Sequence, residues 1–171
     1  MIQDALPGLS TMVKPFRFPT SAYEYKLVTL RECPPTEDQF LCDTPQRAAD
    51  YWRHHLPTDP RFNSEVECLV ALMVNTRRRV KGHYLVATGT VDTILCHARE
   101  VFRVAIVASA SAVILMHNHP SGDASPSEAD VKVTRDMIRA GQLLRIDLLD
   151  HIIMGSGGSH RSLRELGYFT I

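Results

Sequence analysis

The chain has 171 residues, of which 44% are hydrophobic and 22% are charged, and its formal net charge is +0. This length suits one domain with its own hydrophobic core, and the balanced charge argues against a global basic field for nucleic acid. Residues 1–4 lack the basic stretch of a secretory signal, and the uncharged run at residues 104–116 is too short to cross a bilayer. The four cysteines form no C-x-x-C pair, so we expect a cytoplasmic protein with reduced thiols and no membrane segment.

The first third of the chain is expected to hold a leader and a small extension. Residues 1–22 contain three prolines and no apolar period, which is typical of a flexible leader. Residues 23–62 are expected to form a strand–helix extension, with the strand at residues 25–30. The helix begins near Thr44, where a capping residue is followed by proline. The remaining residues, 63–171, are predicted to form the main domain.

Strands and helices alternate in the main domain. Strands are expected at residues 67–74 and 112–116, because after Glu67 both segments are continuous apolar runs, which are typical of strands buried on both faces. Apolar residues at helical spacing predict helices at residues 98–108 and 127–141, and Gly141 is the candidate C-cap of the second. The other expected elements are strands at 80–87 and 146–154, a mobile loop at 155–159 and a closing segment at 163–169. This order predicts an α/β sandwich with a mixed central β-sheet flanked by helices.

Two histidines follow the second apolar run, where His117 and His119 flank Asn118 and precede Pro120. On a strand, residues two apart point to the same face with Cα atoms about 7 Å apart, so two imidazoles at this spacing can converge on one ion. Pro120 has no backbone N–H and is expected to end the strand. A histidine pair alone is more often structural, so a metal site needs a further donor.

Asp130 offers that donor in the first turn of the next predicted helix. Two imidazoles and one carboxylate fit a catalytic zinc site that keeps one coordination position for water. The same residues, Ser127-x-x-Asp130, also match a capping box, with serine at the N-cap and the acid at N3. We expect these two roles of Asp130 to exclude each other, because a single geometry should not serve both.

The pattern His117-x-His119-Pro followed by Ser127-x-x-Asp130 resembles the JAMM motif of JAB/MPN-plus metalloproteases. The longer string HNHPSGD…PSEAD, with AREVFR before it and LDHII after it, resembles the bacterial RadC-like JAB-domain proteins over roughly residues 63–169. The resemblance implies a JAB/MPN-like (cytidine-deaminase-like) fold, one zinc ion and hydrolysis of peptide or isopeptide bonds. Eukaryotic JAMM proteins usually carry serine or threonine between the two histidines. Asn118 departs from that pattern and matches the RadC branch.

Amide hydrolysis also needs a group that takes the proton of the attacking water and passes it to the leaving amine. The candidates are Glu65, Glu67 and Glu100, each of which precedes apolar structure. The resemblance places the JAMM glutamate just ahead of the first central strand, which favours Glu67 as general base, with Glu65 on the same strand face as the alternative. A carboxylate entering an apolar strand is costly unless it has such a role. Glu100 is expected to be an ion-pair partner on its helix.

The sequence leaves alternatives open at several other positions. The resemblance gives Ser127 a hydroxyl that hydrogen-bonds the oxyanion or the metal water, while the alternative is a plain N-cap. Asp150 and His151 form either a carboxylate–imidazole pair behind the metal or a structural hydrogen bond, and the structural alternative is favoured. Asn118 and Asp123 are expected to organise the loop after the histidine strand.

Two other classes of function compete with zinc-dependent hydrolysis. The RadC family name suggests a DNA-associated accessory module, but the balanced charge argues against it, as does the lack of a recognisable helix-hairpin-helix segment like that of long RadC proteins. Nucleobase deamination needs a Pro-Cys-x-x-Cys partner to a His-x-Glu, and the sequence has neither. We therefore expect a peptide or isopeptide substrate, and the sequence leaves its identity and the oligomeric state open.

Overall fold

The computed structural model describes residues 39–89 and 96–169 of the chain. The expected leader at residues 1–22 and the expected strand at residues 25–30 lie outside the described residues. The described elements, in chain order, are α1 (Pro45–His55), the 3-10 turn η1 (Leu56–Thr58), β1 (Cys68–Val74), β2 (Val80–Thr88), α2 (Ala98–Val107), β3 (Ala112–Asn118), α3 (Glu128–Leu144), β4 (Asp147–Met154), the 3-10 turn η2 (Ser156–Gly158) and β5 (His160–Ser162).

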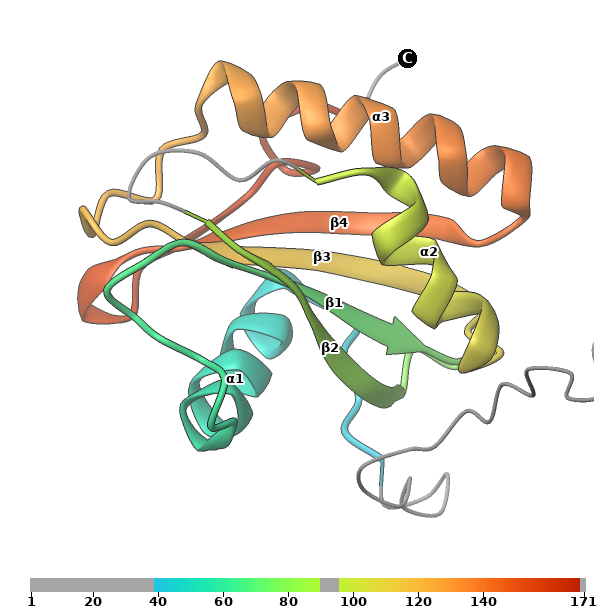
Figure 1. The fold of residues 1–171 in the computed structure, drawn as a ribbon, viewed down its shortest axis with the longest axis horizontal. Helices are drawn as coiled ribbons and strands as arrows, with labels where there is room; N and C mark the ends of the chain where they lie inside the picture. The colour runs from blue at the N-terminus through green and yellow to red at the C-terminus, as the bar shows by residue number, and fades with distance from the viewer. Residues whose placement is uncertain (1–38, 90–95, 170–171) are drawn as a thin grey trace, which may run out of the picture.

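The five described strands form one mixed sheet in the order β2-β1-β3-β4-β5 (Figure 1). β1 pairs antiparallel with both β2 and β3, β3 pairs parallel with β4, and β4 pairs antiparallel with β5. Every residue of β1 and of β3 is buried. This agrees with the prediction, from their continuous apolar runs, that both are central strands. The prediction of an α/β domain with a mixed sheet is therefore confirmed.

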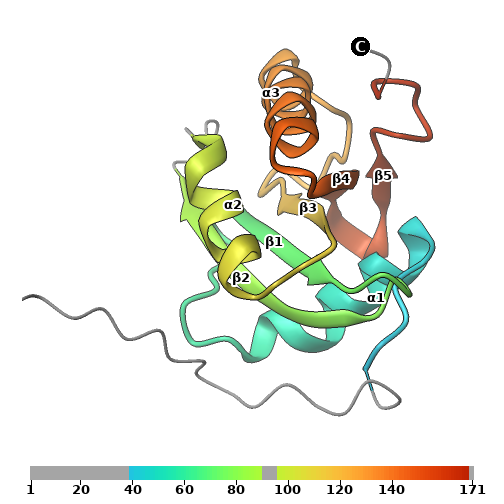
Figure 2. The same ribbon diagram turned by 90° about the vertical axis from the view of Figure 1, so that its right-hand side faces the viewer.

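Helices cover both faces of the sheet, with α1 on one face and α2 and α3 on the other (Figures 1 and 2). Successive strand residues point to opposite faces, so β1 and β3 contribute to two cores. Val70 and Ile114 belong to the core under α1, whereas Leu69 and Leu115 belong to the core under α2 and α3. His117, two residues after Leu115, therefore points to the α3 side of the sheet.

The end of α3 differs from the prediction. The helix continues past Gly141 to Leu144, and the C-cap is Arg145, which adopts a positive φ of 58°. A Cβ atom on Gly141 would lie 2.5 Å from the carbonyl oxygen of Ile146 and 3.3 Å from the backbone nitrogen of Leu148. The prediction of Gly141 as C-cap is thus wrong, because the glycine serves the close approach of α3 to the start of β4.

The segment at residues 155–159, which was expected to be a mobile loop, contains the 3-10 turn η2 and is hydrogen-bonded to the rest of the domain. The backbone N–H of Ser156 donates to the carbonyl of Gly122 at 2.9 Å, which ties this turn to the loop after β3. A Cβ atom on Gly122, whose φ is +84°, would lie 2.7 Å from Ser156 Oγ, so the contact requires glycine. The next residues form β5, which the sequence analysis missed because three residues are too few to show a period.

Two global features accompany this fold. Cys42, Cys68 and Cys96 are free thiols. Among the residues that the structure describes, the helices are all too short or too polar to cross a lipid bilayer.

Candidate metal centre

The two histidines of the sequence motif lie at the end of β3, on the face that α3 covers. His117 is within the strand and only 2% exposed. His119 follows the strand, and its backbone N–H donates to the carbonyl of Met154 at 3.0 Å, which continues the pairing with β4. The Nε2 atoms of the two imidazoles lie 2.9 Å apart. The two-residue spacing therefore brings the rings together, as predicted.

Asp130 joins the histidines from the first turn of α3. Its Oδ1 atom lies 3.1 Å from His117 Nε2, and its Oδ2 atom lies 3.5 Å from His119 Nε2. One ligand atom from each of the three residues lies within 4.8 Å of the other two, so the group could hold a metal ion. The structure thus assembles the three predicted ligands into one cluster.

The same aspartate also completes the capping box of α3. Asp130 Oδ2 accepts hydrogen bonds from the backbone N–H and the hydroxyl of Ser127, at 2.8 and 2.7 Å. The Ser127 hydroxyl oxygen in turn accepts from the backbone N–H of Asp130 at 3.2 Å. The sequence led us to expect that capping and ligation exclude each other, but in the structure the capped carboxylate already faces the cluster: Oδ2 serves the cap while Oδ1 faces His117. The cap orients the carboxylate toward the imidazoles.

These contacts determine the charge of the cluster. Burial alone would raise the pKa of Asp130, but the close contacts of its carboxylate with His117 and His119 outweigh it and hold the pKa well below its ordinary value. The hydrogen bond to Asp130 is also the main reason that the pKa of His119 is raised, with smaller contributions from the Asp123 carbonyl and the charges of Asp130 and Glu67. Asp130 is therefore anionic at neutral pH, as a metal ligand must be.

Each imidazole is also held through its second ring nitrogen. His119 Nδ1 lies 2.7 Å from the carbonyl oxygen of Asp123, and since a carbonyl only accepts, Nδ1 carries the proton. His117 Nδ1 lies 2.9 Å from Nε2 of His151 on β4. The His151 ring is fully buried, and burial lowers its pKa well below the ordinary value. In both histidines the nitrogen that faces Asp130 is Nε2.

Glu67 reaches this end of the sheet on the chain that enters β1. β1 and β3 are antiparallel with Leu69 opposite His117, so Glu67, two residues before Leu69, lies at the same end of the sheet as His119. Glu67 is half-buried, and its charge contributes to the raised pKa of His119. The structure therefore brings the predicted base to the side of the metal cluster.

Asn118 holds the segment that carries Glu67. Its Oδ1 atom accepts a hydrogen bond from the backbone N–H of Cys68 at 3.0 Å. Its Nδ2 atom donates to the carbonyls of Val66 at 2.9 Å and Ser64 at 3.3 Å. The expected role of Asn118 in organising the loop after β3 does not include this contact, because no local pattern relates residues 64–68 to residue 118.

The other predicted carboxylates lie elsewhere. Glu65 is exposed in a turn and not on the face of β1, so the prediction of its position is wrong. Glu100 forms ion pairs with Arg99 and Arg103, as predicted. Asp150 accepts a hydrogen bond from the backbone N–H of His151, at 2.7 Å, and not from the ring, which agrees with the structural alternative.

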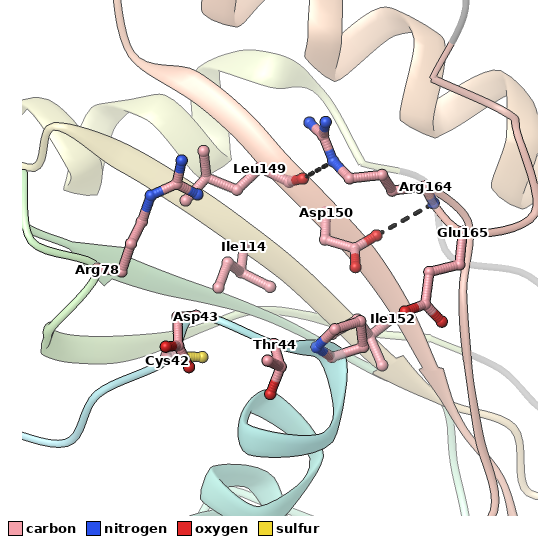
Figure 3. A pocket seen from close by; sticks show the side chains of 11 residues that line it. Cys42, Asp43, Thr44, Arg78, Ile114, Leu149, Asp150, Ile152, Arg164 and Glu165 are labelled. Carbon is pink, nitrogen blue, oxygen red and sulfur yellow. Dashed lines mark hydrogen bonds between the residues drawn. The ribbon is translucent and has the colours of Figure 1, made fainter.

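A pocket of about 210 Å³ lies on the α1 side of the sheet (Figure 3). Asp150 lines it, and its carboxylate already accepts hydrogen bonds from Ser162 Oγ at 2.6 Å and from the backbone N–H of Arg164 at 3.2 Å. Cys42 also lines it, and burial raises the pKa of that thiol to about 12, which keeps it protonated. Asp150 is thus already hydrogen-bonded and Cys42 is unreactive, so we place the candidate site at the cluster on the α3 side.

A mixed α/β sheet with a His-x-His at a strand end and an aspartate at the next helix start defines the class of JAB domains. A search against known families agrees, since the profile described as the RadC-like JAB domain matches residues 42–168. The chain therefore belongs to the RadC-like JAB domain family, as the sequence motif indicated.

Several curated proteins are similar to this chain. UPF0758 protein tlr1707 of Thermosynechococcus vestitus is 40% identical over 129 residues, which is 75% of this chain and 49% of that protein. A UPF0758 protein of Desulforamulus reducens is 46% identical over 101 residues, 59% of this chain and 44% of that protein. UPF0758 protein Mbar_A2303 of Methanosarcina barkeri is 42% identical over 102 residues, 60% of this chain and 44% of that protein. The chain thus spans about half the length of these relatives.

Proposed function

We propose that this domain is a zinc-dependent hydrolase of the JAMM type that cleaves peptide or isopeptide bonds. The observation that carries the proposal is the convergence of His117, His119 and Asp130 at the end of β3. Membership of the RadC-like JAB domain family supports a metal-dependent hydrolase. The position of Glu67, close enough to His119 for its charge to raise the pKa of that imidazole, supports amide hydrolysis in particular, because a carboxylate beside the metal ligands can serve as the base.

The donor set fits one zinc ion. Ligand atoms held about 2.0–2.1 Å from zinc in tetrahedral geometry lie about 3.3 Å apart. The two Nε2 atoms are 2.9 Å apart, His117 Nε2 lies 3.1 Å from Asp130 Oδ1, and His119 Nε2 lies 3.5 Å from Oδ2 of the same carboxylate. Two imidazoles whose Nδ1 atoms are already engaged and one anionic carboxylate are common ligands of catalytic zinc, and three protein ligands leave a position for water.

Zinc in this site would lower the pKa of a water molecule and polarise the substrate carbonyl. The carboxylate of Glu67 would take a proton from the attacking water and pass it to the nitrogen of the leaving amine. Asn118 would keep Glu67 in place for both transfers. The hydroxyl of Ser127, which now donates to Asp130 Oδ2, would turn to donate to the oxyanion that forms on the carbonyl.

The test combines metal analysis with a substrate screen of the purified chain. We expect one zinc per chain, and cleavage of peptide or isopeptide substrates that a chelator abolishes and added zinc restores. His117→Ala should lose both the zinc and the activity. A chain that takes up no zinc would refute the proposal. Salt-sensitive binding to duplex DNA without peptide cleavage would favour a DNA-associated function instead.

A further inference from the structure

A continuous line of hydrogen bonds runs behind His117, through the interior between β4 and α3. His117 Nδ1 lies 2.9 Å from His151 Nε2, and His151 Nδ1 lies 2.6 Å from Thr134 Oγ1. Thr134 Oγ1 also lies 2.6 Å from the backbone carbonyl of Asp130, one helical turn earlier. His117, His151 and Thr134 are 2%, 1% and 0% exposed, so water does not compete for these bonds. The line begins at one candidate ligand and ends at the backbone of another.

The carbonyl at the end of this line sets the direction of every bond in it. A carbonyl oxygen only accepts, so the single hydroxyl proton of Thr134 goes to Asp130. Thr134 Oγ1 can then only accept from His151, which requires a proton on His151 Nδ1. The two groups that touch the His151 ring, a hydroxyl and an imidazole, carry no negative charge, and a buried charged ring would lack compensation. The ring is therefore neutral, and its Nε2 atom accepts.

The same logic extends to His117. Because His151 Nε2 accepts, His117 Nδ1 must donate to it. The nitrogen that remains for a metal is Nε2, which is the atom that faces Asp130 Oδ1 and His119 Nε2. Without this constraint a neutral imidazole can hold its proton on either nitrogen, and the tautomer with the proton on Nε2 cannot bind metal through that atom.

We propose that His151 and Thr134 are positioning residues that keep the proton of His117 on Nδ1, so that Nε2 presents its lone pair to the metal. The inference rests on the proposed metal site, and it concerns the location of a proton and not the charge of the ring. It assigns a role to Thr134, which has no contact with the metal cluster except through Asp130 and His151. It also assigns His151 to the hydrogen-bond shell behind the site, where partners orient ligand histidines and tune metal affinity.

The test compares two substitutions of Thr134. Thr134→Val keeps the shape of the side chain but removes the acceptor for His151 Nδ1, which frees both rings to change tautomer. Thr134→Ser keeps the hydroxyl and is the matched control. We expect the valine variant to bind zinc about 10- to 100-fold more weakly than the wild type, the usual effect of losing such a partner, and the serine variant to bind within about threefold. Affinity is measured by competition with a chromogenic chelator, beside a thermal unfolding curve for each protein.

A second measurement does not depend on zinc. Long-range ¹H–¹⁵N spectra of the histidine rings, recorded on metal-free protein at mildly alkaline pH, report which nitrogen is protonated. We expect His117 to carry its proton on Nδ1 in the wild type and in Thr134→Ser, and to show a mixture of tautomers in Thr134→Val. A purely structural role for Thr134 would lower the melting temperature without changing zinc affinity or tautomer.

The outcomes separate this inference from the proposed function. Equal zinc affinity of Thr134→Val and wild type, or a wild-type His117 without a proton on Nδ1, would overturn the inference and leave the hydrolase proposal standing. Zinc affinities that follow the hydroxyl at position 134, together with no cleavage of any amide substrate, would support the inference and refute the hydrolase. If the wild type binds no zinc, the metal-site proposal fails, and with it the inference.

Discussion

Asn118 and Cys68 are joined by a 3.0 Å hydrogen bond from the backbone N–H of Cys68 to the side-chain oxygen of Asn118. Together with the bonds from Nδ2 to the carbonyls of Val66 and Ser64, it ties the residue between the two candidate ligand histidines to the segment that carries Glu67. The amide side chain of Asn118 therefore helps to fix the position of the proposed base relative to the metal cluster.

Asn118→Ala removes these three bonds and should separate metal binding from turnover. The ligands are unchanged, so we expect zinc to be retained, while the displaced Glu67 lowers kcat by about 10²-fold, the order expected for a misplacement of about 1 Å. The matched control is Asn63→Ala, which removes only an exposed turn bond to the N–H of Glu65. Zinc content and kcat are measured on both variants, and an Asn118→Ala protein with full activity would contradict this role.

Glu67→Gln tests the base itself. Glutamine keeps the size and the hydrogen bonding of the side chain but cannot accept the proton of the water. We expect normal folding, full zinc content and a loss of turnover of about 10²- to 10⁴-fold, the usual contribution of a positioned base. If the variant loses its zinc, Glu67 is a ligand or a structural residue. If it keeps both zinc and activity, the base lies elsewhere.

Asp130→Ala and Ser127→Ala separate the two roles of the capping box. Asp130→Ala removes both a ligand and half of the cap, so zinc affinity should fall and activity should fall with it. Ser127→Ala removes only the serine part of the cap, which should cost about 1 kcal/mol of stability and leave zinc bound. Zinc titration and thermal unfolding of both proteins give the comparison. Strong zinc binding by Asp130→Ala would exclude Asp130 as a ligand.

Gly141→Ala should destabilise the protein although alanine favours helices. The new Cβ would lie 2.5 Å from the carbonyl oxygen of Ile146, which is backbone and cannot turn aside. Overpacking of this kind costs about 1–3 kcal/mol, which exceeds the gain of about 1 kcal/mol in helix propensity. Gly82→Ala on β2, where a Cβ would meet nothing within 4 Å, is the control and should change stability little. Urea unfolding measures both, and a stabilised Gly141→Ala would show that α3 and β4 can separate without cost.

Asp59 should make stability depend on pH in the acid range. The hydrogen bond from the side chain of Arg61 is the main cause that lowers the pKa of Asp59 below its ordinary value. The ionised form therefore stabilises the folded protein above the unfolded pKa of about 3.9, and this contribution is lost as the pH falls toward the folded value.

We accordingly expect Asp59→Asn to lower the melting temperature by about 3 °C at neutral pH, which corresponds to about 1 kcal/mol, and the difference to shrink below pH 4. Asp43→Asn breaks the half-exposed pair with Arg47 and is the control, with little effect at any pH. Melting curves across the acid range measure both variants. A difference between Asp59→Asn and wild type that stays constant with pH would show that the carboxylate charge is not involved.

The parts of the site that the sequence predicted depend on local geometry. His117 and His119 share a face because strand residues alternate, and Asp130 lies at N3 because the capping pattern starts the helix there. The apolar runs likewise predicted β1 and β3 as central strands, since a strand that is buried on both faces has apolar side chains at consecutive positions. These features need no knowledge of which strands are neighbours.

Only the tertiary structure decided what surrounds the ligands. β1 and β4 flank β3 through pairings such as Leu69 with His117 and His117 with Ile153, between residues far apart in the chain. That arrangement brings the Asn118 amide to the Glu67 segment and the His151 ring to His117. Hydrophobic periodicity cannot predict these contacts, because it does not show which strands are neighbours. The tertiary arrangement also let Asp130 cap α3 and face His117 at once, because the start of α3 lies beside the end of β3 and the two oxygens of one carboxylate can serve two partners.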